Sequence, residues 1–170
     1  MPTESFYKFK DYDLWLRDGF LMPFELLLFE DLQAKYGETD QEINEFKDLI
    51  VENSLLRFIT GDMLCINFDK ALISGNTLQR LIKSTESIIE KIVNDKNSLT
   101  AVRINELLTK AKNYSIEKGK SKIEDYPDIL DAGYEDELPI KNYLHAFYLI
   151  KLLLKGEIKD SDRNFLLVGD

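Results

Sequence analysis

The sequence contains only one cysteine, one histidine and no long hydrophobic run. A single cysteine cannot close a disulfide within the chain, and zinc or di-iron sites usually need more histidine or cysteine ligands than this. Apolar runs such as Leu26–Phe29 are far shorter than the ~20 residues that a membrane span requires. Residues 1–8 also lack the basic and apolar segments of a signal peptide. We therefore expect a cytoplasmic protein that needs no cofactor.

Basic side chains are also in the minority. The chain carries 22 Lys and Arg against 31 Asp and Glu, which gives a net charge of −9 and a pI near 4.7. Nucleic acids and anionic lipids are both bound through cationic surfaces, which neutralise their phosphates. The composition therefore argues against direct binding to nucleic acid or to a membrane.

The rest of the composition is that of an ordinary folded domain. Of the 170 residues, 44% are hydrophobic, so the chain can bury a core without a metal or a disulfide. Apolar residues recur at intervals of three and four along most of the chain, which is typical of amphipathic helices. The sequence predicts an all-α fold: one compact domain over 1–170, built as a bundle or an orthogonal array of five to six helices.

Capping residues, proline and glycine set the predicted helix boundaries. We expect a first helix over 10–20, a second from Pro23 to Gly37, a third from a capping box at Thr39–Glu42 to Gly61, a fourth capped by Asn76 or Thr77, a fifth ending at Gly119, and a sixth between Pro139 and Gly156. Residues 62–75 are ambiguous, because 63–68 could be a short extended segment or a helical turn. Cys65 lies in this apolar run, and we expect it to be buried.

Charge is distributed unevenly along the chain. Residues 71–123 carry 10 basic and 5 acidic side chains, whereas residues 124–137 carry 7 acidic and no basic ones. The acidic stretch lies within an expected loop over 119–138 and also contains tyrosines and aliphatic residues. Carboxylates set among such anchors suit binding to a basic protein, since charge steers encounter and buried rings supply affinity.

This stretch supplies the predicted partner-binding residues, which are Asp125, Tyr126, Asp128, Asp131, Tyr134, Glu135, Asp136 and Glu137. Two other interpretations remain open. The stretch could be a solvated loop that only aids solubility. It could also fold back onto basic side chains of the fourth and fifth helices, namely Lys110, Lys112, Lys118, Lys120 and Lys122.

Catalytic motifs are not found in the sequence. Gly-rich phosphate loops and the Gly-x-Ser-x-Gly nucleophile pattern are both missing. His145 would be the only histidine base, and its place in an apolar helix favours a structural role. Glu42, Glu45, Glu86 and Glu90 could hold Mg²⁺ if their helices met. Such helical glutamates make the chain similar in composition to the all-α nucleotide pyrophosphohydrolases. The Glu-Glu-x-x-Glu motif of that family, followed by Glu-x-x-Asp, is not met in this sequence. We therefore expect these glutamate side chains to face solvent.

The aromatic residues of the N-terminus could form either core or an exposed binding face. They are Phe6, Tyr7, Phe9, Tyr12, Trp15 and Phe20. Such residues dominate binding hot spots, but they are more often buried in the protein's own core.

Three functions fit these observations. The first is an acidic protein-binding module that inhibits a toxin, a nuclease or another protein with a basic cleft. This profile resembles that of immunity proteins and phage inhibitors of nucleases, without a family motif at any residue. The second is a scaffold or homo-oligomeric adaptor built by pairing apolar helix faces. The third is a Mg²⁺-dependent helical phosphohydrolase.

Overall fold

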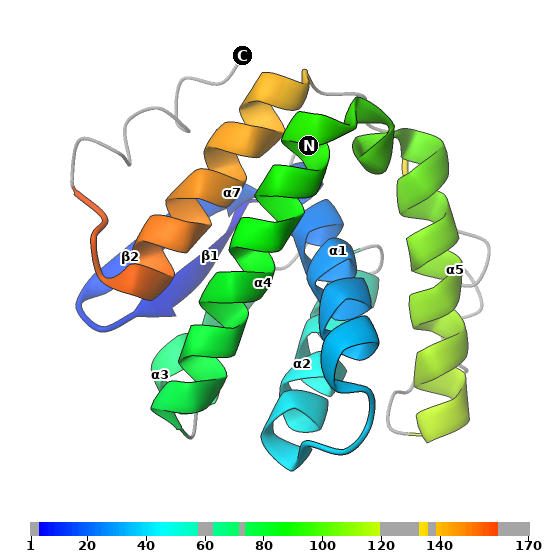
Figure 1. Cartoon of the computed structure of the whole chain (residues 1–170), viewed down its shortest axis with the longest axis horizontal. Coiled ribbons are helices and arrows are strands. Elements are labelled where there is room, and N and C mark those ends of the chain that lie inside the picture. Colours follow the sequence, from blue (N-terminus) through cyan, green and yellow to red (C-terminus); the bar gives the residue numbers. More distant parts are fainter. Residues whose placement is uncertain (1–3, 58–62, 72–73, 120–132, 136–138, 160–170) are drawn as a thin grey trace.

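The computed structural model describes residues 4–57, 63–71, 74–119, 133–135 and 139–159. These residues form a mostly helical protein with a small three-stranded sheet (Figure 1). The helical character predicted from the sequence is therefore confirmed. The prediction of an all-α fold omits the sheet, of which only the extended segment near 63–68 was anticipated.

The N-terminal segment forms a β-hairpin. Strand β1 (Glu4–Phe9) pairs antiparallel with β2 (Tyr12–Arg17), and β3 (Cys65–Asn67) adds parallel to β1, in the order β2-β1-β3. The helix predicted over 10–20 is thus wrong. Leu14 and Leu16 are buried while Trp15 between them is exposed, which is the two-residue period of a strand. Lys10 makes the tight turn with a positive φ of 54°.

Helix α1 (Asp18–Tyr36) lies at the centre of the fold. It begins five residues before Pro23, so the prediction that Pro23 opens this helix is wrong, whereas its end at Gly37 is confirmed. A proline inside a helix leaves the carbonyl four residues earlier without its amide donor. Here that carbonyl belongs to Gly19, and the Tyr134 hydroxyl donates a hydrogen bond to it at 3.1 Å. A side chain from a distant part of the chain therefore satisfies the backbone of α1.

Helices α2 (Gln41–Leu56) and α4 (Gly75–Asn94) each begin at a different cap from the one predicted. The α2 cap is Asp40, whose carboxylate accepts from the Ile43 amide at 3.1 Å, instead of Thr39. The α4 cap is Ser74, whose hydroxyl accepts from the Thr77 amide at 3.2 Å, instead of Asn76 or Thr77. Neighbouring residues with similar side chains compete for a cap, so the sequence locates it only within a few positions.

The remaining elements are α3 (Phe68–Ala71), the 3₁₀ turn η1 (Lys96–Leu99), α5 (Ala101–Lys118) and α7 (Ile140–Lys155). Gly119 and Gly156 end α5 and α7 with φ of 59° and 70°, as predicted. Pro139 precedes α7, also as predicted. The ambiguous stretch near 63–68 contains both alternatives, because strand β3 runs directly into the short helix α3.

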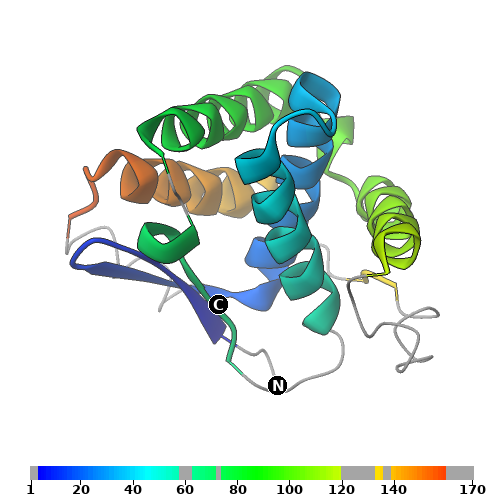
Figure 2. The same cartoon turned by 90° about the horizontal axis from the view of Figure 1, so that it is seen from below.

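The core is built around α1, which packs against α2, α4, α5 and α7. The helices lie on one side of the hairpin, with α7 and α4 side by side (Figures 1 and 2). Most of α1 is buried, from Phe20 through Leu32, because a helix with apolar residues on all sides must be enclosed by its neighbours. The described part of the chain contains no helix with the length and apolarity needed to cross a membrane.

Candidate functional site

Helix α2 presents an acidic surface. It carries four acidic residues, Glu42, Glu45, Asp48 and Glu52, and its one basic residue, Lys47, is fully buried. The Lys47 ammonium donates to the Gly37 carbonyl at 2.5 Å and to the Gln33 side-chain oxygen at 2.6 Å, at the end of α1. Because Lys47 is withdrawn into the interior, the charge that α2 shows to solvent is negative throughout.

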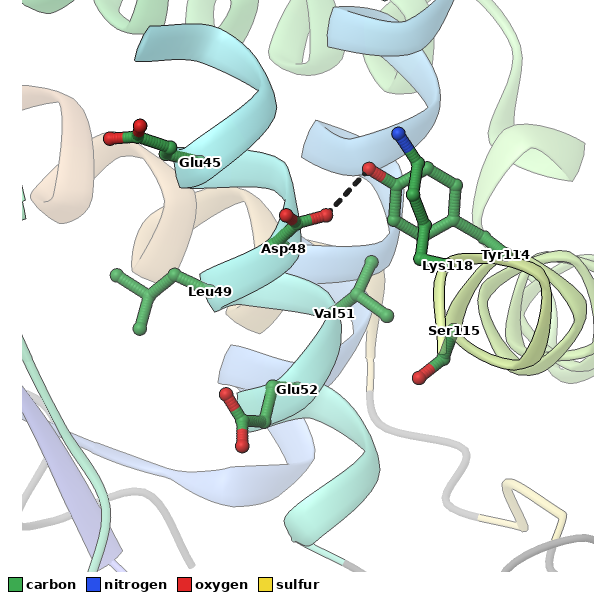
Figure 3. Close-up of a pocket in the computed structure, with 8 residues that line it drawn as sticks. All are labelled: Glu45, Asp48, Leu49, Val51, Glu52, Tyr114, Ser115 and Lys118. Atoms are coloured by element: carbon green, nitrogen blue, oxygen red, sulfur yellow. Dashed lines mark hydrogen bonds between the residues drawn. The ribbon is translucent and has the colours of Figure 1, made fainter. Parts of the chain in front are cut away.

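A groove runs between α2 and α5 (Figure 3). Its volume is about 400 Å³, and its lining residues are Glu45, Asp48, Leu49, Val51, Glu52, Tyr114, Ser115 and Lys118. The three acidic residues are spaced three and four apart, so they follow one face of α2. Leu49, Val51 and the Tyr114 ring supply the apolar part of the lining. The lining of the groove thus combines carboxylates with apolar side chains.

Tyr114 fixes the position of one of these carboxylates. Its hydroxyl donates to Asp48 at 2.7 Å, and burial together with this contact raises the pKa of Tyr114. The Lys118 ammonium lies 5.3 Å from the centre of the Tyr114 ring and pairs with Glu38 at 3.4 Å. Among the described residues, Glu45 and Glu52 have no basic partner. Glu45 accepts a hydrogen bond from the Gln41 side chain at 3.0 Å, and both carboxylates are exposed to solvent.

A second hollow of about 420 Å³ adjoins the groove at the N-termini of α2 and α4, and Glu45 lines both. Here the Glu42 carboxylate accepts from the Ser74 hydroxyl at 2.6 Å and also from the Thr77 hydroxyl, and both contacts lower its pKa. Arg80 pairs with Asp40. Glu42 is therefore engaged in joining two helices, in contrast to the more open Glu45.

The proposed magnesium ligands are not brought together. Glu42 and Glu45 lie on α2, whereas Glu86 and Glu90 are exposed on α4. The described segments contain no group of three or more His, Cys, Asp or Glu side chains arranged to hold a metal ion. His145 is half-buried on α7, and Cys65 is exposed, so the prediction that Cys65 is buried is wrong.

Basic side chains of α4 and α5 pair with acidic residues of α1. Arg103 reaches both Glu30 oxygens at 2.5 and 2.6 Å, and Lys110 reaches Glu30 at 3.1 Å. Burial alone would raise the pKa of Glu30, but these two cations outweigh it and lower the pKa. The excess positive charge of residues 71–123 is thus partly neutralised by α1, and α2 remains an acidic surface.

Asp31 is buried and contacts the exposed ammonium groups of two lysines, Lys35 at 2.6 Å and Lys91 at 3.1 Å. Burial opposes ionisation, but these contacts outweigh it and lower the pKa of Asp31. A lowered carboxyl pKa stabilises the folded state above the unfolded pKa near 4, and this contribution is lost as the pH falls through the folded pKa.

We expect Asp31→Asn to lower the free energy of unfolding by about 1–3 kcal/mol at pH 7. Because the lost contribution depends on ionised Asp31, the variant and the parent should converge in acid. Urea unfolding at pH 7 and pH 3 measures both effects. Glu86→Gln, which removes an exposed carboxylate on the same helix as Lys91, is the control and should be nearly neutral at both pH values. If Asp31→Asn lowered the free energy of unfolding equally at pH 7 and pH 3, the contribution of ionised Asp31 to stability would be contradicted.

Of the predicted partner-binding residues, the structure describes Tyr134 and Glu135. Tyr134 is buried, with 6% of its surface exposed, and its backbone pairs with the Asn105 side chain at 2.6 and 3.1 Å. Glu135 is exposed and lines a hollow of about 260 Å³ together with Arg57. The other predicted residues lie outside the described residues: Asp125, Tyr126, Asp128, Asp131, Asp136 and Glu137.

The structure also reveals a buried ionic cluster that the sequence analysis missed. Arg57 donates to both Glu25 oxygens at 2.7 and 3.1 Å and also pairs with Asp18. The Tyr7 hydroxyl donates to Glu25 at 2.7 Å, and burial followed by the Glu25 charge raises the pKa of Tyr7. The hydrogen-bonded partners in this cluster are 18 to 39 positions apart, so no local pattern could have found them.

Comparison with protein-family models, with curated proteins and with solved structures finds no match for this chain.

Proposed function

We propose that this protein is an acidic protein-binding module that inhibits a partner with a basic active-site or nucleic-acid-binding cleft. The observation that carries the proposal is the surface of α2, where Glu45, Asp48 and Glu52 line a groove while Lys47 is buried. Charged groups concentrated on one face accelerate encounter with an oppositely charged partner.

The groove suits a long basic side chain of the partner. An arginine or lysine combines an apolar stem with a cationic head. The stem would lie against Val51 and the Tyr114 ring, which lie on the facing sides of α2 and α5, and the head would meet a carboxylate of α2. Because Asp48 is already held by Tyr114, it would keep its place when the ligand enters.

The acidic stretch 124–137 is included in the proposal through Glu135, its one carboxylate among the described residues. The chain leaves α5 at Gly119, next to Lys118 of the groove, and returns at Gly133 beside Asn105 of the same helix. Glu135 then shares a hollow with Arg57, which follows α2 directly. Gly119, Gly133 and Glu135 thus lie close to the groove-forming helices. We include its carboxylates in the partner-binding surface, but not the Tyr134 ring, which is buried in the core.

The test is a charge reversal on α2. A partner captured from a lysate of the source organism is purified, and its association with wild-type and variant protein is followed by surface plasmon resonance at several salt concentrations. We expect Glu45→Lys with Glu52→Lys to slow association about tenfold or more, since both carboxylates would steer the partner. The salt dependence of the association rate should also become weaker.

Glu86→Lys with Glu90→Lys is the matched control. It makes the same change in net charge at two exposed positions on α4, outside the groove. Slower association of the α2 variant alone supports the proposal. Equally slow association of both variants would show that only the net charge of the protein matters, and would contradict a binding site on α2. Reversal of Glu135, Asp136 and Glu137 in the same assay tests the acidic segment, and an unchanged rate and salt dependence would remove that segment from the interface.

A further inference from the structure

The hairpin has an outer face that no described helix covers. Tyr7, Leu14 and Leu16 point to the core, and the alternate residues of the same strands point away from it. Figure 2 shows the described helices on the other side of the strands. This outer face comprises Glu4, Phe6, Lys8, Asp13, Trp15, Arg17, Cys65 and Asn67.

The middle row of this face is apolar. Phe6 stands opposite Trp15 in the register, and their rings stack with centroids 4.7 Å apart. Cys65 continues the row on β3, opposite Phe6, and is also exposed. Trp15 is 40% exposed, although tryptophan is a residue that proteins usually bury or place in interfaces. The row is therefore a candidate contact surface.

The charges on either side of the row follow a self-complementary order. Along β2 the outer residues run Arg17, Trp15, Asp13, and along β1 the residues opposite them run Glu4, Phe6, Lys8. Each strand thus has an aromatic centre, one basic end and one acidic end. The two strands have these ends in opposite order.

A two-fold axis along the aromatic row converts this order into a matching interface. The rotation places each strand over the same strand of the second copy, running in the opposite direction. Arg17 then faces the second copy's Asp13, and Glu4 faces the second copy's Lys8. Trp15 and Phe6 then meet their own counterparts. Isologous dimers require a patch that is complementary to itself in this way. Opposite charges facing one another favour this pairing, and like charges would oppose it.

We propose that the outer face of the hairpin binds a second copy of this chain, with the two sheets packed face to face around Trp15 and Phe6. Strands of six residues are about 20 Å long and lie about 5 Å apart, so the contact covers only a few hundred Å² per copy. Interfaces of that size belong to weak and transient complexes. The dimer should therefore form at high micromolar concentration instead of being obligate.

Trp15 reports directly on this contact, because it is the only tryptophan in the chain. With increasing concentration of the wild-type protein, we expect its emission to shift to shorter wavelength and its quenching by iodide to decrease. Sedimentation equilibrium on the same samples should show a monomer–dimer equilibrium over the same range. A monomer throughout the millimolar range would overturn the proposal, and Trp15 shielded at every concentration would show that the chain covers this face itself.

Two complementary variants test the charge pattern. Glu4→Lys with Asp13→Lys makes all four charges of the face positive, and Lys8→Glu with Arg17→Glu makes them all negative. Each variant alone should remain monomeric, and an equimolar mixture should form a heterodimer. Circular dichroism and thermal unfolding of each variant verify its fold. Dimerisation of either variant alone, or a mixture of folded variants that does not associate, would contradict the two-fold arrangement.

This inference is independent of the proposed function. Reversal of Glu45 and Glu52 changes α2 and leaves the hairpin untouched, so it should not alter dimerisation. The hairpin variants in turn leave the groove unchanged. The two proposals can therefore fail separately.

Discussion

Replacement of Arg57 by methionine is expected to destabilise the protein by about 3–5 kcal/mol, because it leaves a buried carboxylate without its counter-charge. The Arg57 side chain is 2% exposed and that of Glu25 is fully buried, so water cannot replace the lost contacts. For a chain of this size the loss corresponds to a fall in Tm of about 10 °C. Urea unfolding at pH 7 and thermal unfolding measure it.

A triple variant separates the cost of the unpaired charge from the value of the cluster itself. Tyr7→Phe, Glu25→Met and Arg57→Met together remove most of the polar groups and keep similar volumes. Replacing a whole buried ionic group by apolar residues is often nearly neutral. The triple variant should therefore recover most of the stability lost in Arg57→Met, and failure to do so would show that Arg57 contributes mainly through packing.

The pH dependence of Arg57→Met provides a second check. Without Arg57, the folded variant holds a buried carboxylate that lacks a counter-charge, and uptake of a proton removes this charge. The variant should therefore lose less stability relative to the parent at pH 5 than at pH 7. A stability difference between Arg57→Met and the parent that does not depend on pH would contradict this account.

Tyr134→Phe is expected to lower the free energy of unfolding by about 2–3 kcal/mol, since it removes one hydroxyl that is hydrogen-bonded to a buried hydroxyl and to a half-buried carbonyl. This hydroxyl donates to the Gly19 carbonyl and is hydrogen-bonded to the Tyr143 hydroxyl. Tyr143 lies in the core, where an unpaired polar group is costly, and the Gly19 carbonyl is half-buried within helix α1. Chemical denaturation of the variant and of the parent at the same pH measures the difference.

The proline in α1 supplies the control for Tyr134. In Pro23→Ala the new amide can donate to the Gly19 carbonyl, as in an ordinary helix. Tyr134→Phe should therefore cost about 1 kcal/mol less in the Pro23→Ala background than in the parent. A double-mutant cycle measures this coupling, and additive effects would mean that Tyr134 does not act through the backbone of α1.

The helices that could be predicted are those whose signals are local. Residues 77–93 and the segments before Gly119 and Gly156 combine helical spacing with a glycine or a hydroxyl cap, and all three appear in the structure. The hairpin was missed, although Tyr12, Leu14 and Leu16 alternate with polar or exposed residues. Its turn at Lys10 lacks the Asn-Gly or Gly signals by which short hairpins are usually predicted.

The candidate site was predictable only in part. The acidic residues of α2 are visible in the sequence, and Glu45 was already considered as a metal ligand. The sequence could not show that Lys47 is buried beneath them, or that Glu42 is engaged by Ser74 and Thr77. It also could not show that Arg103 and Lys110 pair with Glu30. Which charges remain exposed depends on contacts between separate helices.

The sequence by itself determined the acidic character, the position of most helices and their glycine ends, because these follow from composition and from interactions within a few residues. The tertiary structure decided which carboxylates form the groove, how Arg57 is buried and how Tyr134 completes α1. The Tyr134–Gly19 contact joins residues 115 positions apart. Such contacts exist only once the helices have packed, since packing alone brings their side chains within hydrogen-bonding distance and removes competing water.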